Sequence, residues 1–182
     1  RLKQTDALIY CDSAYLHENQ HVEAYGHVGI RQGETLNITG DRLDYSGKDR
    51  IATITGGVRL SDPGMELTTD ALTYDLRERS AQYGNGAKIA STRDGNTLTS
   101  RRGLYLVAVH RFIFSGDVRI EHPDRTITSD SLQYVTTDGV AEFLGPTEVL
   151  QGTTHMYCER GSFDTRAGRG RFTKAARIVN GG

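Results

Sequence analysis

Carboxylate side chains recur at nearly regular spacing along this 182-residue chain, and they are the first candidates for chemistry because carboxylates bind hard cations such as Ca²⁺. A calcium site needs several ligands around one point, whereas neighbours in this series stand 29 residues or more apart. We therefore predict no metal site, and we expect these side chains to hydrogen-bond to their own backbone at corners of the fold. The series consists of Asp12, Asp41, Asp70, Asp130 and Glu159.

The fourth place in this series carries Arg101 instead of an acid, and Arg102 follows it. Two adjacent guanidinium groups could bind a phosphate through paired hydrogen bonds, and the apolar segment 106–110 could line an opening for an apolar ligand. In the alternative interpretation Arg101 forms ion pairs with Asp70 and Asp130, and the apolar segment is a longer buried strand. We favour this alternative.

Histidine and hydroxyl side chains show no catalytic pattern. The six histidines are scattered, and His17 and His21 are the only pair close in sequence. No pattern of two histidines plus a carboxylate emerges, which argues against a metal centre. No Ser/His/Asp or Cys/His grouping occurs within a supporting motif. We predict that the protein is not an enzyme and needs no cofactor.

Tyrosines form a second regular row, at Tyr45, Tyr74, Tyr105 and Tyr134. Such a row could be an aromatic platform for sugars. We favour the interpretation that these rings pack in the core, beside the leucines that stand two positions earlier in most repeats.

These rows reflect one repeat that occurs six times. Leu16, Tyr45, Tyr74, Tyr105, Tyr134 and Phe163 are equivalent and follow one another in steps of 29, 29, 31, 29 and 29 residues. A fixed period of this length indicates units that bury their apolar faces by stacking on their neighbours. No linker interrupts the repeat, so we predict a single domain over residues 1–182.

The second half of each repeat alternates apolar and polar residues, which predicts half-buried strands. A glycine in the middle of most of these strands predicts a bulge or sharp bend, and Asp-Gly or Pro-containing turns follow at both ends. We predict an all-β fold of about a dozen bent strands, mostly antiparallel, arranged as an elongated bent jelly roll or half-pipe of six two-strand repeats. A β-helix with parallel coils is the competing arrangement. The predicted inward residues are Val28, Ile30, Ile54, Val58, Leu60, Tyr83, Ile89, Phe112, Phe114, Val118, Ile120, Phe143, Val149, Phe172 and Ile178.

Cys11 and Cys158 occupy equivalent places in the first and last repeats. Several stacked repeats separate them, so we expect the distance between their Cα atoms to exceed the roughly 7 Å that a disulfide can span. We therefore predict two free thiols. Head-to-tail docking of two copies would bring Cys158 of one copy next to Cys11 of the other.

Bulk composition excludes some classes of function. The formal net charge is −1 at pH 7, so the basic patch expected of a nucleic-acid-binding protein is not indicated. No stretch approaches the roughly 18 apolar residues of a membrane span. The chain starts at Arg1, and we presume that a signal peptide has been removed.

Several segments resemble the OstA-like, LptA-type family of lipopolysaccharide-transport proteins. They are residues 9–16 (IYCDSAYL), 22–28 (VEAYGHV), 67–74 (LTTDALTY) and 127–134 (ITSDSLQY). The resemblance covers nearly the whole chain and implies a jelly roll in the periplasm that holds acyl chains inside and keeps sugar and phosphate groups outside. It also implies head-to-tail docking onto itself or onto other jelly-roll transport proteins through edge strands.

We therefore expect a non-enzymatic, periplasmic lipid-binding bridge or carrier that serves outer-membrane biogenesis. The fifteen inward residues named above would form its acyl groove, and Arg101 with Arg102 could contact a phosphate. The alternatives are a β-helix-type carbohydrate-binding or carbohydrate-active protein, and a structural β-repeat scaffold without a ligand.

Overall fold

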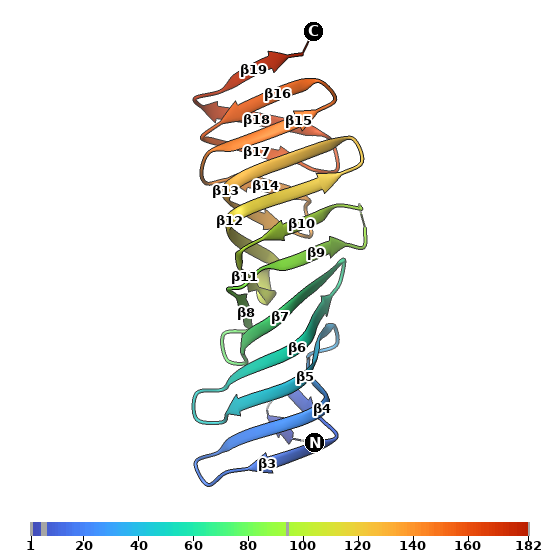
Figure 1. The fold of residues 1–182 in the computed structure, drawn as a ribbon, viewed down its shortest axis with the longest axis vertical. Helices are drawn as coiled ribbons and strands as arrows, with labels where there is room; N and C mark the ends of the chain where they lie inside the picture. Colours follow the sequence, from blue (N-terminus) through green and yellow to red (C-terminus); the bar gives the residue numbers. More distant parts are fainter. Residues whose placement is uncertain (1, 5–6, 94, 182) are drawn as a thin grey trace.

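A computed structural model describes residues 2–4, 7–93 and 95–181 of the chain. The molecule is a long, narrow stack of strands with the two termini at opposite ends (Figure 1). All pairings between its strands are antiparallel. The predicted all-β, half-pipe fold is therefore confirmed, and the parallel β-helix is wrong.

The chain crosses the molecule in bent passes, each of which turns a corner halfway. Six passes are continuous strands: β4 (His21–Gln32), β5 (Leu36–Ser46), β6 (Ile51–Asp62), β7 (Met65–Asp75), β12 (Arg111–His122) and β13 (Arg125–Val135). The other passes are interrupted at the corner, which is why 19 strands stand where the sequence predicts about a dozen.

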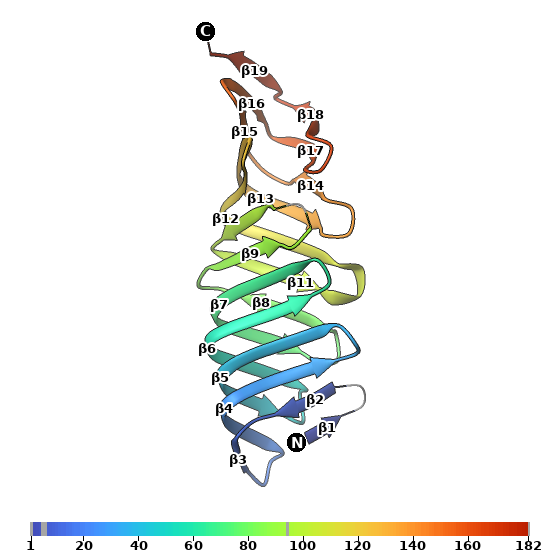
Figure 2. The same cartoon turned by 90° about the vertical axis from the view of Figure 1, so that its right-hand side faces the viewer.

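The corners divide the sheet into two layers, which face each other across a common interior (Figure 2). The first layer contains the C-terminal halves of β4, β6 and β12, the N-terminal halves of β5, β7 and β13, and seven short strands. These are β1 (Leu2–Gln4), β2 (Ala7–Tyr10), β9 (Ala87–Ser91), β10 (Thr97–Ser100), β15 (Thr147–Gln151), β16 (Thr154–Cys158) and β19 (Arg177–Asn180). The second layer contains the remaining halves with β3 (Ser13–Leu16), β8 (Ser80–Tyr83), β11 (Arg102–Leu106), β14 (Val140–Phe143), β17 (Arg160–Asp164) and β18 (Arg169–Lys174).

Glycine makes the corners possible. The strand register shifts between Thr55 and Val58, where Gly56 has a φ of +81° that side-chain-bearing residues rarely adopt. A Cβ atom at Gly56 would lie 2.5 Å from Oδ2 of Asp41. Equivalent bulges occur at Gly26 and Gly116. The predicted bend in the middle of these strands is confirmed.

The acids of the first row lie at these corners, but their hydrogen bonds differ from the prediction. The backbone N–H of Asp12 donates to the carbonyl of Gly26, and that of Glu159 donates to the carbonyl of Lys174. The two side chains bind other side chains, since Asp12 lies 2.6 Å from His27 and Glu159 lies 2.6 Å from Lys174. The predicted bonds to their own backbone are wrong for these two residues.

One segment departs from both interpretations offered for it. Residues Val107–Val109 form a short 3₁₀ turn, in which Val107 is buried and Val109 is 52% exposed. The turn ends at His110 in the left-handed conformation. Segment 106–110 is therefore a capped turn, neither an opening nor a longer strand. In the part of the chain that the structure describes, no helix is long and apolar enough to cross a membrane.

Candidate functional site

The candidate site is the interior between the two layers, because alternate residues of every pass point into it. Thirteen of the fifteen predicted inward residues are at most 6% exposed, from Val28 at the N-terminal end to Val149 near the other end. Phe172 is half-buried and Ile178 is 63% exposed. The strand register pairs Val149 with Met156 and Met156 with Ile178, which places Ile178 on the same face as the buried Val149. Its side chain is nevertheless exposed, so a role for Ile178 in an acyl groove stays a prediction.

Aromatic rings fill the middle of this interior. The ring of Phe112 stacks on Tyr105 at 4.2 Å between centroids and on Phe114 at 5.0 Å. The four tyrosines of the regular row, including Tyr105, are at most 9% exposed, so the predicted core packing is confirmed and an exposed sugar platform is excluded. A void of about 20 Å³ lies beside Phe114, enough for about one water molecule. The described side chains around Phe114 are therefore closely packed.

The two layers are held together, along the side away from the corners, by polar side chains. We call this side the lip. Near the middle of the chain, Tyr105 of the second layer donates a hydrogen bond to Oδ2 of Asp62, at the end of β6 in the first layer. His110 lies 3.4 Å from the same oxygen. The other carboxylate oxygen, Oδ1, is buried and has no hydrogen-bond partner among the described residues.

Equivalent contacts occur on both sides of this one. Tyr74 donates to the side-chain carbonyl of Gln32, whose amide donates to the carbonyl of Leu76 at 3.3 Å. Farther along the chain, the guanidinium group of Arg125 donates to the carbonyl of Thr165 at 2.8 Å. The lip is thus closed by separate polar contacts, while the corner side is closed by covalent backbone.

Burial keeps the interior tyrosines neutral at physiological pH. It raises the pKa of Tyr83 to about 12, against the opposing effect of a hydrogen bond to Ser100. Burial, and next the hydrogen bond to Asp62, raise the pKa of Tyr105 well above its usual range. The surface of the interior is therefore mainly apolar groups and uncharged phenols, and its buried polar residues include Gln32, Asp62 and Arg125 at the lip.

Towards the C-terminal end the strands of the two layers diverge (Figure 2), and some inward side chains are only partly buried. Phe143 is buried and stacks on the half-buried Phe172 at 6.2 Å between centroids, and Met156 is also only partly buried. Among the described residues, these side chains are the part of the apolar interior that is least covered near the C-terminal end.

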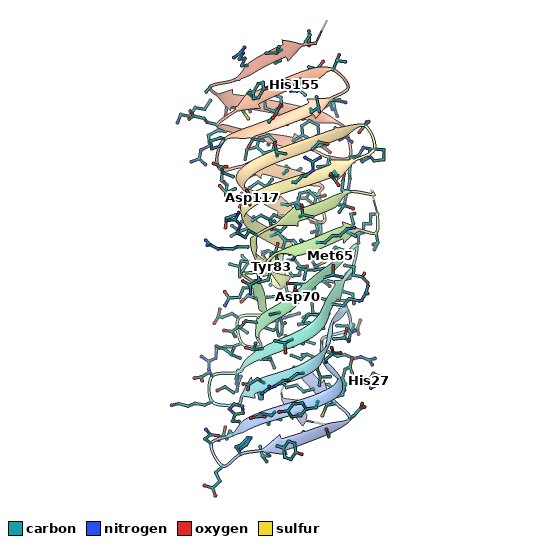
Figure 3. All side chains as sticks on the ribbon, in the orientation of Figure 1. His27, Met65, Asp70, Tyr83, Asp117 and His155 are labelled. Carbon is teal, nitrogen blue, oxygen red and sulfur yellow. The ribbon has the colours of Figure 1, made fainter. Side chains whose placement is uncertain are left out.

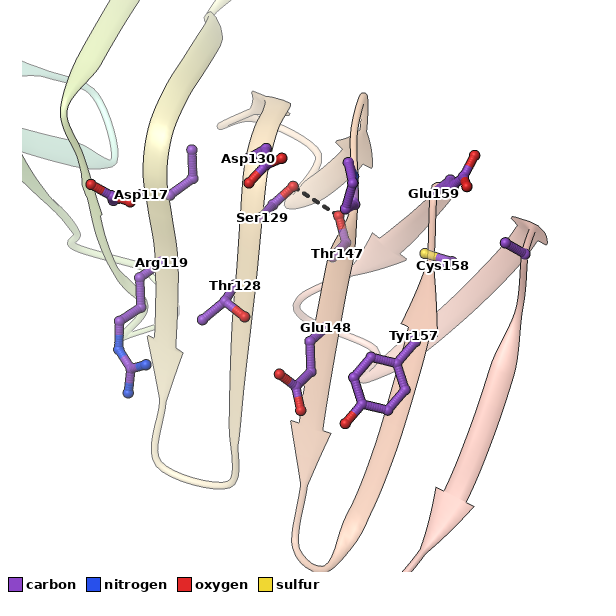
Figure 4. A pocket seen from close by; sticks show the side chains of 13 residues that line it. Asp117, Arg119, Thr128, Ser129, Asp130, Thr147, Glu148, Tyr157, Cys158 and Glu159 are labelled. Atoms are coloured by element: carbon purple, nitrogen blue, oxygen red, sulfur yellow. Dashed lines mark hydrogen bonds between the residues drawn. The ribbon is translucent and has the colours of Figure 1, made fainter.

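The outer surface near this end carries a broad, open groove of about 590 Å³. Figure 4 shows its acidic side chains, among them Asp117, Asp130, Glu148 and Glu159, with Arg119 as the one basic group in its lining. Ser129 and Thr147 form a hydrogen bond of 2.8 Å across its floor. Three of these acids pair with basic side chains, Asp117 with Arg101, Glu148 with His155 and Glu159 with Lys174.

Arg101 and Arg102 are not brought together on one ligand. Arg101 pairs with the exposed Asp117, so the predicted pairing with Asp70 and Asp130 is wrong. Arg102 lines a different open groove, of about 460 Å³, on the outer face of the second layer. A phosphate contact by either arginine stays a prediction, and at Arg101 it would have to compete with Asp117.

The remaining titratable candidates lie outside the interior or are inactive. His27 projects from a corner (Figure 3), and its hydrogen bond to Asp12 raises its pKa. Cys11 and Cys158 are both free, as predicted. Burial raises the pKa of the Cys158 thiol, which lowers its reactivity as a nucleophile.

Comparison with known proteins identifies the family of this chain. The OstA-like protein family matches the chain over residues 1–130. The chain belongs to this family. The structure of LptH from Pseudomonas aeruginosa, described as the LptA-homologous periplasmic component of the lipopolysaccharide transport device, shares 13% sequence identity with this OstA-like chain. That similarity covers 97% of the chain and 95% of LptH, with a TM-score of 0.31. Among curated proteins, none matches.

Proposed function

We propose that this OstA-like chain is a non-enzymatic, periplasmic bridge or carrier in lipopolysaccharide transport to the outer membrane, and that residues 1–182 act as one domain. The observation that carries the proposal is the apolar interior, which all six repeats share and which only polar contacts close along the lip. Membership of the OstA-like family supports lipopolysaccharide as the class of ligand.

Acyl chains would lie between the layers, against the inward residues from Val28 to Phe172. Each CH₂ group removed from water contributes roughly 0.8 kcal/mol. This gain would offset the loss of contacts across the lip, where each hydrogen bond contributes a net 0.5–1.5 kcal/mol, roughly. Chains would enter at the accessible end near Phe143 and move between equivalent positions of successive repeats.

A tryptophan reporter tests this proposal. The chain contains no tryptophan, so Phe143→Trp would introduce a single fluorophore into the interior. We expect lipopolysaccharide with brominated acyl chains to quench its fluorescence strongly, because bromine quenches on contact. Tyr157→Trp is the matched control, since Tyr157 is 38% exposed on the outer surface. Equal quenching at the two positions would contradict binding between the layers.

The packed interior favours a second candidate, a structural scaffold that binds no lipid. A void of about 20 Å³ is what such a scaffold requires. The two candidates differ in one respect: only the carrier opens at the lip when lipid is present. The alternative of a β-helix-type carbohydrate protein required parallel coils, and the strands pair antiparallel instead.

We also propose head-to-tail docking through the edge strands. Tyr15 and Leu16 of β3 are 65% and 76% exposed at one end, and Ile178 of β19 is 63% exposed at the other. An edge strand with unpaired backbone groups is a template for strand addition. The partner would be a second copy or another jelly-roll protein.

Ile178→Asp is expected to reduce self-association at least tenfold, because it places a charge where the next copy would dock. Sedimentation velocity over a range of protein concentrations measures this change. Val109→Asp is the matched control, since Val109 is 52% exposed in the middle of the chain. Self-association that persists in Ile178→Asp, or that Val109→Asp reduces equally, would contradict docking at this end.

A further inference from the structure

Imidazole and carboxylate groups converge on the outer face of the first repeat, away from the apolar interior. His21 and Glu23 stand two positions apart on β4 and therefore lie on the same face of the strand. Asp44 of β5 is the register partner of Glu23. One ligand atom from each of these three residues lies within 4.8 Å of the others. His17, in the turn before β4, places its Nε2 atom 3.6 Å from Oε1 of Glu23.

Two features of the cluster favour a cation. Glu23 and Asp44 are like charges directly opposite each other on neighbouring strands, an arrangement that destabilises a sheet unless cations balance it. Arg42, 3.6 Å from Glu23, supplies one positive charge against the two carboxylates. Nε2 of His21 lies 3.1 Å from Oδ2 of Asp44. Ligands of a tetrahedral zinc ion lie roughly 3.4 Å apart, so the His21–Asp44 and His17–Glu23 pairs already have suitable spacing.

Neighbouring side chains orient one of these ligands. Tyr25 donates a hydrogen bond of 2.5 Å to Oε2 of Glu23, and Arg42 lies 3.6 Å from the same oxygen. The other oxygen, Oε1, is thereby directed towards His17. Partners that fix a ligand in this way strengthen metal sites.

We propose that His21, Glu23 and Asp44, with His17 as fourth ligand, bind a divalent transition-metal ion of the Zn²⁺ class. Imidazole nitrogen suits Zn²⁺ and its neighbours in the transition series, whereas Ca²⁺ and Mg²⁺ prefer oxygen ligands alone. All four side chains are partly exposed, so rotamer changes can bring them onto one ion. The ion would fix the turn between β3 and β4 onto β5.

Zinc titration of the purified chain, with a chromogenic chelator as competitor, tests the site. We expect one equivalent of Zn²⁺ per chain, and a loss of affinity of about tenfold or more in His21→Ala and in Asp44→Asn. Tyr25→Phe should weaken binding by about tenfold without changing the stoichiometry. His155→Ala is the matched control, because His155 lies 2.6 Å from Glu148 in a histidine–carboxylate pair that lies outside the cluster.

Two further measurements make the result independent of folding. Circular dichroism identifies any variant that is unfolded. If His21→Ala is unfolded, Asp44→Asn takes its place in the comparison. Bound Co²⁺ should show the intense visible absorption of a tetrahedral site, which His21→Ala abolishes and His155→Ala retains. The absence of saturable Zn²⁺ binding to the wild type, or an equal loss of affinity in His155→Ala, would overturn the proposal.

Discussion

Phe112→Ala is expected to lower the free energy of unfolding by about 3–5 kcal/mol. Phe112 has no exposed surface, and its ring lies between Tyr105 and Phe114 in the aromatic stack. Removing it leaves a cavity that neighbours on two strand layers cannot fill without moving backbone. Urea unfolding followed by circular dichroism measures the change.

The control for this prediction is a neighbouring substitution, and the Phe112→Ala variant also tests the role of lipid. Ile113→Ala alters the next residue, which is 38% exposed on the outer face, and should cost about 1 kcal/mol. If acyl chains lie between the layers, lipopolysaccharide should occupy the new cavity and raise the unfolding temperature of Phe112→Ala more than that of the wild type. A scaffold without a ligand predicts the loss of stability and no recovery.

Tyr105→Phe is expected to weaken the lip and to increase lipid binding. The change removes the hydrogen bond to Asp62, whose carboxylate is buried and whose Oδ1 atom already has no partner among the described residues. The same oxygen, Oδ2, would keep His110 at 3.4 Å, but losing a hydrogen bond at this buried carboxylate still costs about 1–3 kcal/mol. This cost applies to the form in which the lip contacts hold the two layers together. We therefore expect brominated lipopolysaccharide to quench the Phe143→Trp reporter at a lower lipid concentration in Tyr105→Phe than in the protein with Tyr105.

Tyr157→Phe serves as the control, since Tyr157 lies on the outer surface, and it should change neither stability nor lipid binding appreciably. Urea unfolding measures the stability of the two variants, and the quenching titration measures their lipid binding. A loss of stability in Tyr105→Phe with an unchanged titration would mean that the lip contacts stabilise the fold without controlling access.

The sequence predicts most of this architecture because the signals are local and repeated. Alternating residues such as Ile54 and Val58 specify an inward face, and a glycine such as Gly56 allows the bend between them. Six copies in register make even a weak pattern informative. The repeat also places the tyrosines correctly in the core, at Tyr74 and Tyr105.

Contacts between different repeats could not be predicted in the same way. Asp62 stands in an Asp-Pro-Gly turn and looks like a turn residue, yet it closes the lip with Tyr105, which is 43 positions away. Likewise, Asp44 joins His21 and Glu23 only through strand register. The long sequence separation hides these partners. The exposure of Ile178 was missed for another reason, because periodicity predicts which face of a strand a residue occupies and not whether other side chains cover it.

The most direct test of acyl binding between the layers is a photo-crosslinking scan with lipopolysaccharide. A photoreactive residue would replace Ile54, Val118 or Phe143 inside, and Arg59, Arg119 or Glu142 outside. The account predicts lipid adducts at the three inward positions and none at the three outward positions. Adducts at none of the six positions in a folded protein, or equal adducts on both faces, would contradict it.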